Sequence, residues 1–125
     1  YVKNQILVYE LLEIITCVSG MWIFKYIKKK DMDFYGVTSK DLDGIIDQLR
    51  LREGVEGALF LYETGPQQYK VSMRSQHVVD VSRIAAYFGG GGHVRAAGCT
   101  MNGSIHDVIN NLAGHIAKEL EEAEA

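Results

Sequence analysis

Residues 89–92 are four consecutive glycines, and they constrain the fold of this chain more than any other feature of its sequence. Glycine loses more backbone entropy on folding than any other residue, so four in a row require a structural or functional reason. A main chain without Cβ atoms can approach another group closely, and its N–H groups then bind a phosphate well. His93 and Arg95 follow at once and add side-chain donors, and residues 96–98 are all small. The segment therefore predicts contact with a phosphate-bearing ligand.

Simpler explanations account for only part of this segment. Gly89 alone would suffice to end a helix, but a helix end does not need the next three glycines. The segment is not a P-loop, because no Gly-Lys-Ser/Thr follows it. It is not the dinucleotide-binding fingerprint either, because that motif joins the first strand and helix of a βαβ unit and this one follows a predicted helix.

Polar side chains near the glycines are candidates for ligand binding. Arg74 projects from an alternating strand beside Ser72, and a guanidinium can bind a phosphate through two parallel hydrogen bonds. His93 can donate to a phosphate or act as an acid near neutral pH, whereas only its position and charge support Arg95. No residue of this chain is predicted to be catalytic or to bind a metal. The residues predicted to bind substrate are Ser72, Arg74, Gly90, Gly91, Gly92, His93 and Arg95.

Positive charge gathers around the glycines although the whole chain is slightly acidic, with 13 basic and 16 acidic residues. Residues 67–98 hold four basic side chains and one acidic side chain, whereas residues 104–125 hold one basic and five acidic. This distribution favours a small anionic ligand over a long polymer. No apolar run is long enough to span a bilayer, so no membrane partner is expected. Cys17 and Cys99 are expected to be reduced, buried thiols of a cytoplasmic protein.

The hydrophobic pattern predicts an α/β fold: a mixed β-sheet of about four or five strands, including one hairpin, with helices packed on it. Thr38 with Asp41 resembles a capping box that begins a helix, and Asp80 is a good N-cap. The expected elements are a helix over residues 4–16, a strand over 21–27, a helix from Thr38 that ends at Gly54, strands over 55–62 and 68–75 joined by a turn at 64–66, a short helix over 80–88, a strand over 98–101 and a helix from Ser104 onward.

The carboxylates show no arrangement typical of a metal-dependent active site. Most of them fall on the polar faces of predicted helices, and the chain has no zinc-type spacing of Cys and His. Asp31 and Asp33 form an Asp-x-Asp pair after the three lysines at 28–30, with no histidine near them in the sequence. A solvated loop and a surface turn are expected there. No Ser-His-Asp or Cys-His pattern of a nucleophilic hydrolase is recognisable.

Residues 90–98 resemble the GGGHxxAAG motif of the DHH-associated domain, first subfamily, the C-terminal domain of DHH-superfamily phosphoesterases. Residues 70–75 resemble the SxRS-type strand that precedes this motif, and residues 80–85 resemble the helix that leads into it. Residues 42–50 and 54–56 look like the upstream helix and strand of the family. The resemblance covers about residues 20–120 and points to the branch of oligoribonucleases that are also 3′-phosphoadenosine 5′-phosphate phosphatases.

The resemblance implies a division of labour between two domains. In such proteins an N-terminal DHH domain holds manganese through Asp and His residues, and the C-terminal domain binds the nucleotide. This sequence contains no Asp-His-His motif. Residues 19–125 are therefore expected to be the substrate-binding domain, inactive alone, and residues 1–18 the end of the helix connecting it to the DHH domain. The implied partners are that DHH domain, with its Mn²⁺, and a short single-stranded oligonucleotide or a phosphorylated nucleotide.

Two other functions stay open on the sequence. One is a tRNA-binding module like the C-terminal domain of alanyl-tRNA synthetase, which also uses a glycine-rich loop but usually lacks the His-x-x-Ala-Ala-Gly continuation. The other is a dimerisation domain forming a homodimer, which would require apolar surface outside the glycine segment. Within the phosphoesterase interpretation, oligoribonucleotides, 3′,5′-bisphosphate nucleotides, cyclic dinucleotides and single-stranded DNA are all compatible substrates.

Overall fold

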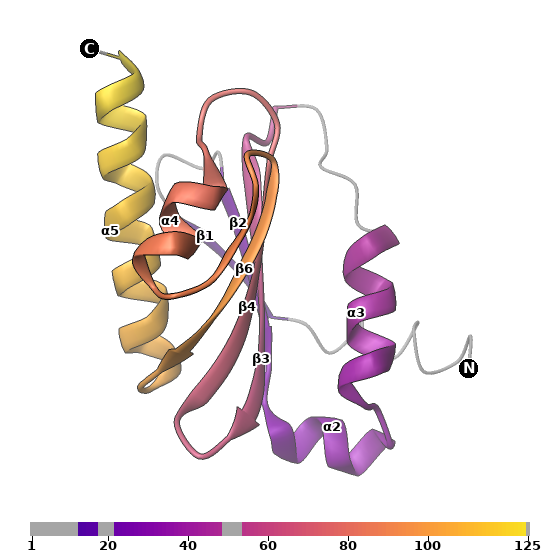
Figure 1. Ribbon diagram of the computed structural model, residues 1–125. Helices are drawn as coiled ribbons and strands as arrows, with labels where there is room; N and C mark the ends of the chain where they lie inside the picture. The colour runs from indigo at the N-terminus through magenta and orange to yellow at the C-terminus, as the bar shows by residue number, and fades with distance from the viewer. Residues whose placement is uncertain (1–12, 18–21, 49–53, 125) are drawn as a thin grey trace.

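A six-stranded mixed sheet forms the centre of the part of the chain that the computed structural model describes, residues 13–17, 22–48 and 54–124 (Figure 1). Its spatial order is β1-β2-β3-β4-β6-β5, in which β2 and β3 run parallel and all other neighbours run antiparallel. The predicted α/β fold with a mixed sheet is confirmed, and the predicted hairpin is formed by β3 and β4, although the sheet has more strands and hairpins than expected. The strands are β1 (Glu13–Cys17), β2 (Trp22–Ile27), β3 (Gly57–Gly65), β4 (Gln68–Ser75), β5 (Gly91–His93) and β6 (Ala96–Asn102).

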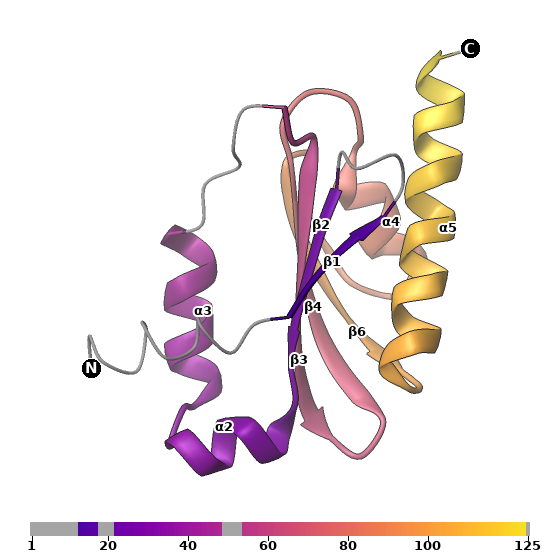
Figure 2. The ribbon, with the colours of Figure 1, turned by 180° about the vertical axis from the view of Figure 1, so that it is seen from behind.

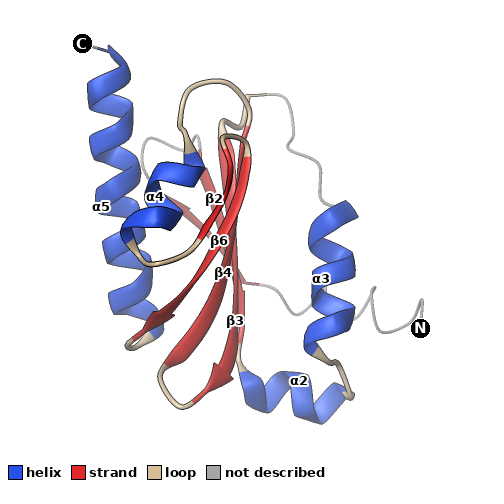
Figure 3. Cartoon of the chain, in the orientation of Figure 1, coloured by secondary structure: helices blue, strands red, loops and turns tan. Residues whose placement is uncertain are grey.

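Helices cover both faces of this sheet. The helices α2 (Lys29–Tyr35) and α3 (Ser39–Gln48) connect β2 to β3 on one face. On the opposite face lie α4 (Val81–Tyr87) and α5 (Ile105–Glu124), as the two opposite views in Figures 1 and 2 and the cartoon in Figure 3 agree in placing them. Among the residues described, no helix is both long and apolar enough to cross a lipid bilayer.

The two sides of the sheet bury hydrophobic cores of different size. The larger core lies under α4 and α5 and takes the inward residues Tyr69, Val71 and Met73 of β4. Their alternation with half-exposed residues confirms the predicted strand over 68–75. The smaller core lies under α2 and α3 and contains Ile27, Met32, Val37, Leu42, Phe60 and Tyr62.

Side-chain caps begin three of the helices at the positions that the sequence predicts. The main-chain N–H and the hydroxyl of Thr38 donate to the Asp41 carboxylate, at 3.0 and 3.1 Å, before α3. Asp80 accepts from the main-chain N–H of Ser82 at the start of α4, and its hydrogen bonds with Ser82 hold the pKa of this carboxyl below its usual value. Ser104 Oγ accepts from the N–H of Asp107 before α5. These bonds satisfy N–H groups that have no partner within the helix.

Two predictions about the first third of the chain are wrong where the structure describes it. Residues 13–16, expected to be helical, belong to β1, which pairs antiparallel with β2; residues 4–12 of that predicted helix lie outside the described residues. Within the expected loop and turn at residues 28–33, only Lys28 lies outside a helix, as the N-cap of α2. Residues 29–33 belong to α2, where Lys29 and Asp33 form an i,i+4 ion pair of 3.4 Å. The surface position of both aspartates is as expected, because the ion pair is exposed and Asp31 is only half-buried.

Leu112 offers a test of the core under α5, because its side chain is completely buried. Leu112→Ala should lower the free energy of unfolding by about 2–5 kcal/mol, since it removes buried methyl groups and leaves a cavity. Asn111→Ala, at the exposed neighbouring position of the same helix, should change it by less than about 0.5 kcal/mol. Urea denaturation of the two variants measures the difference. Equal stability of the two variants would contradict the packing of α5 on the sheet.

Candidate functional site

The glycine segment is an edge strand rather than a loop. Gly91–His93 forms β5, which pairs antiparallel with β6 through the partners Gly91↔Gly98, Gly92↔Ala97 and His93↔Ala96. A two-residue turn at 94–95 closes the hairpin. Every residue from Gly89 to Val94 is exposed. The main chain that the sequence predicts to be accessible is therefore accessible, but as one strand of a tight hairpin.

The fold itself requires three of the four glycines. Gly89 ends α4 with φ = +85°, a conformation that side chains rarely allow. A Cβ on Gly90 would lie 2.1 Å from the main-chain oxygen of Gly98, and one on Gly92 would lie 2.6 Å from that of Ala96. Gly91 differs, since a Cβ there would meet nothing within 4 Å and its φ is ordinary. The described part of the chain therefore gives no steric reason for a glycine at this position.

The register of three strands places Arg74 and His93 on the same face of the sheet. Ala96 is the partner of Arg74 in β4 and also of His93 in β5. Residues directly opposite each other in an antiparallel pair point to the same side. Two steps of roughly 4.8 Å between strands put the Cα atoms of Arg74 and His93 about 10 Å apart. A single phosphate group held over Ala96 is within reach of both side chains.

Small side chains cover the sheet around this pair. In the next row Ser72 is the partner of Gly98, and Gly98 is the partner of Gly91. Ala58, the partner of Arg74 on the other side, is also small. These residues are half-exposed or exposed, because the core beneath α2 and α3 involves β2 and β3 rather than β5 and β6. We call this open part of the face the β4–β6–β5 face; it comprises Ala58, Ser72, Arg74, Gly91, His93, Ala96 and Gly98.

Arg95 is placed differently from the other predicted site residues. Its Nη1 donates to the main-chain oxygen of Val79 (2.9 Å) and to Ser75 Oγ (3.2 Å), and its Nη2 donates to the main-chain oxygen of His77 (2.8 Å). The guanidinium is thus engaged by the segment that follows β4. A bound phosphate would have to compete with three internal hydrogen bonds, so we leave Arg95 out of the proposed binding residues.

Lys70 lies on the same face of β4 but is directed toward α3. Its Nζ forms an ion pair of 3.3 Å with Asp43 and lies 5.7 Å from the ring centre of Tyr62. Desolvation lowers the pKa of Lys70, but the hydrogen bond to Tyr62 and the attraction of Asp43 outweigh it, so its pKa is raised. Burial likewise raises the pKa of the Tyr62 hydroxyl. Lys70 is therefore paired with α3 and is not part of the row that contains Arg74.

The sequence analysis missed Glu56, which lies just before β3 and is buried. Its carboxylate accepts hydrogen bonds from the main-chain N–H groups of His77, Val78 and Val79, at 2.7–3.1 Å. The signal was a single charge inside the apolar run 55–62, since such a charge is buried only with partners.

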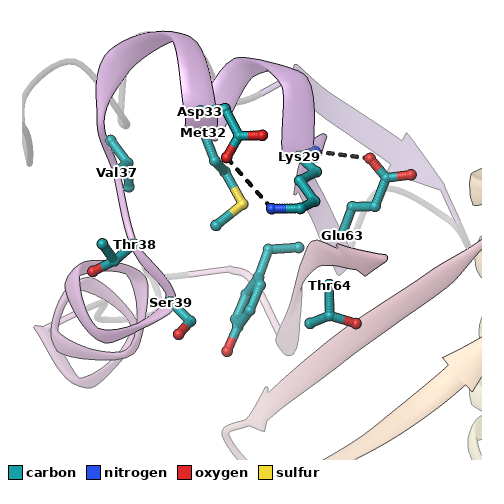
Figure 4. A pocket seen from close by; sticks show the side chains of 9 residues that line it. Lys29, Met32, Asp33, Val37, Thr38, Ser39, Glu63 and Thr64 are labelled. Carbon is teal, nitrogen blue, oxygen red and sulfur yellow. Dashed lines mark hydrogen bonds and ion pairs between the residues drawn. The ribbon is translucent and has the colours of Figure 1, made fainter. Parts of the chain in front are cut away.

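Two of the pockets are lined by described residues, and the larger of these two lies away from the β4–β6–β5 face. It has a volume of about 360 Å³ and lies between α2, the start of α3 and the end of β3, with Lys29, Thr38 and Glu63 in its wall. Figure 4 shows the Lys29 ammonium directed at Asp33, while the main-chain N–H of Lys29 donates to Glu63 at 2.8 Å. The smaller pocket, about 180 Å³, lies between α4 and α5 on the other face. Neither of these two pockets contains the predicted site residues.

The described residues hold no group of three or more His, Cys, Asp and Glu side chains that could bind a metal ion. Cys99 is buried and free, and desolvation raises the pKa of its thiol to about 11. A thiol with such a pKa is protonated at neutral pH and is a poor nucleophile.

Large apolar side chains are exposed at four positions among the described residues, on separate elements. Phe34 lies on α2, Tyr87 lies on α4, and Val78 and Val94 lie in the two connections at the end of the sheet next to His93. Such scattered positions do not favour the dimerisation alternative, for which a continuous apolar patch is typical.

Residues 20–123 match the DHHA1 domain family. The chain is 41% identical over 85 residues to the bifunctional oligoribonuclease and PAP phosphatase NrnA of Thermus thermophilus, an alignment that covers 67% of this chain and 26% of that protein. It is 42% identical over 41 residues to the oligoribonuclease NrnB of Bacillus subtilis, covering 32% of this chain and 10% of that protein. The chain thus spans about a quarter or less of these relatives.

Two solved structures share the fold. An exopolyphosphatase-related protein from Bacteroides fragilis superimposes with a TM-score of 0.78 at 19% identity, over 99% of this chain and 36% of that one. The pGpG-specific phosphodiesterase PggH from Vibrio cholerae superimposes with a TM-score of 0.58 at 12% identity, over 97% of this chain and 40% of that one. At these identities the likeness concerns the fold alone.

Alanine substitutions can distinguish the glycines that the fold requires from Gly91 by their effect on the free energy of unfolding. Gly90→Ala and Gly92→Ala should each lower the free energy of unfolding by about 1–3 kcal/mol or more, because the new Cβ meets main-chain atoms of β6. Gly91→Ala should change it by less than about 0.5 kcal/mol, because its Cβ enters open space. Thermal denaturation followed by circular dichroism measures all three. A destabilised Gly91→Ala would show that the fold, and not a ligand, requires this glycine.

Proposed function

Because this chain belongs to the DHHA1 domain family, near its oligoribonuclease and PAP phosphatase branch, we propose that it is the substrate-binding C-terminal domain of a DHH phosphoesterase. Its ligand would be a short single-stranded oligoribonucleotide or a 3′,5′-bisphosphate nucleotide. The observation that carries the proposal is the row Arg74–Ala96–His93 on the open β4–β6–β5 face. It brings two phosphate-binding side chains together over a floor without bulky side chains.

Each part of this face has a separate task in binding. Arg74 has a guanidinium with five N–H donors, and its Nη1 donates to the main-chain oxygen of Met73 at 2.9 Å. This guanidinium would bind phosphate oxygens. His93 would donate from its imidazole on the opposite side of the same phosphate. Gly91 would let the ligand approach the main chain of β5, and the Ser72 hydroxyl would bind an oxygen in the adjacent row.

Main-chain N–H groups of β5 would add to this binding. In a two-residue hairpin the partners that flank the turn exchange both hydrogen bonds, and the next pair exchanges none. His93 and Ala96 flank the turn here, so the N–H of Gly92 points away from β6 along the sheet edge. An edge strand with an exposed N–H and no side chain is suited to contact an anionic oxygen.

The hydrolytic step itself is assigned to the rest of the protein. The chain spans 26% of NrnA, and the described residues do not fit the metal site that the family implies. We therefore derive no step through manganese on this chain. Its residues would bind and orient the phosphorylated ligand so that groups of a DHH domain in the same protein can act on it.

Removing either side chain of the Arg74–His93 pair should weaken ligand binding. Arg74→Gln and His93→Ala should each lower the affinity for adenosine 3′,5′-bisphosphate by about 10-fold or more, because each removes hydrogen bonds to a charged group. Arg83→Gln is the matched control, since Arg83 lies on α4 on the other face and pairs with Glu119 at 3.4 Å. Titration calorimetry on the purified chain gives the three affinities. Unchanged affinity in both site variants would remove this face as the binding site.

The chain alone should release no phosphate from adenosine 3′,5′-bisphosphate in the presence of Mn²⁺, because its described residues do not form a metal site. A phosphate-release assay over several hours, with a full-length member of the family as the positive control, checks this. Clear turnover by the purified chain would contradict the assignment of catalysis to another domain.

A further inference from the structure

The segment 75–79, between β4 and α4, is held from two sides by charged side chains of opposite sign. Its N–H groups at residues 77, 78 and 79 donate to the buried Glu56 carboxylate. Its main-chain oxygens at residues 77 and 79 accept from the Arg95 guanidinium, which also bonds to Ser75 Oγ. Ser75 Oγ in turn donates to the oxygen of Val79 at 2.7 Å. We call this arrangement the Glu56–Arg95 clamp.

The clamp joins the hairpin that carries His93 to the strand that carries Arg74. Arg95 lies in the hairpin turn, two residues after His93 and one residue before Ala96. Ser75 directly follows Arg74, and its main-chain N–H donates to the oxygen of Arg95 at 3.1 Å. Glu56 lies two residues before Ala58, the other partner of Arg74. The start of β3, the end of β4 and the turn between β5 and β6 are thus all bonded to the segment 75–79.

The edge position of β5 makes this connection important. β5 has three residues and pairs only with β6 among the described strands, so ladder bonds hold His93 from one side alone. The turn at 94–95 is fixed by further bonds, because the oxygen of Val94 accepts from the N–H of Val81 at 3.0 Å. Two side-chain groups tie this turn to the segment after β4: the Ser75 hydroxyl, which donates to the oxygen of Val94 at 3.4 Å, and the Arg95 guanidinium with its three hydrogen bonds.

We propose that Arg95 is a positioning residue, which holds His93 at a fixed separation from Arg74 and does not itself contact the ligand. The inference rests on the proposed function, since it concerns how that phosphate site is kept in shape. This positioning role differs from the direct contact with phosphate that the sequence position and charge of Arg95 suggest. A loosened hairpin would let His93 move away from the phosphate held by Arg74, and affinity would fall without loss of the fold.

A double-mutant cycle tests whether Arg95 acts through His93. The variants are Arg95→Gln, His93→Ala, the double variant and the control Arg83→Gln, each titrated with adenosine 3′,5′-bisphosphate at a temperature where circular dichroism shows it to be folded. We expect Arg95→Gln to lower the affinity about 5-fold in the otherwise unchanged chain, and less than about 2-fold in the His93→Ala background. Arg83→Gln should have no effect in either background.

A milder variant keeps the test decisive if Arg95→Gln does not fold. Ser75→Ala removes one of the three Arg95 partners and should reproduce a smaller loss of affinity, again only when His93 is present. The same loss in both backgrounds would overturn the proposal, since it would mean that Arg95 binds the ligand directly or acts on the whole fold. No loss from Arg95→Gln would also overturn it. Full affinity in His93→Ala would overturn it too, because Arg95 is proposed to act through His93, whereas only full affinity in both His93→Ala and Arg74→Gln would refute the proposed function.

Discussion

The close approach of β5 to β6 is the constraint on which the candidate site depends. At Gly90 and Gly92 the main chain of the hairpin leaves no room for a Cβ atom against Gly98 and Ala96. A turn of two residues closes this hairpin, and it sets the pairing His93↔Ala96. Ala96 is also the partner of Arg74. The main-chain pairing of β5, β6 and β4 thus places the His93 imidazole and the Arg74 guanidinium on one face of the sheet.

The two faces of the sheet have different tasks. The face under α4 and α5 buries the larger core, including Leu112 and Val71, and keeps the strands in register. The opposite face is covered over β2 and β3 and left open over β4, β6 and β5. The acidic C-terminal residues belong to α5, on the covered side, so their negative charge lies across the sheet from the proposed phosphate site. This separation suits a domain that binds an anion on one face.

The sequence predicted elements whose signal is local and missed those that depend on pairing. Alternating residues defined β4, and Asp80 and Thr38 marked helix starts, because caps and alternation act within a few residues. Ile14 and Ile15 lie in β1 because β2 offers an edge, which no periodicity reveals. The three residues that make up β5 have no strand propensity, and they form a strand because they pair with β6. For the site, Arg74 and His93 were predicted from their residue types, and the strand register places them in one row. The hydrogen bonds of Arg95 and of Glu56 could not be predicted, because their partners are main-chain groups of a segment distant in the sequence.

The most direct test of this account is to map where adenosine 3′,5′-bisphosphate binds on the isotopically labelled chain by nuclear magnetic resonance. The account predicts that the amide signals that move are those of Ser72, Arg74 and residues 91–93, with little change at the pocket between α2 and α3. Shifts confined to that pocket, at Lys29, Thr38 and Ser39, would contradict it. So would a titration in which no signal moves at millimolar ligand.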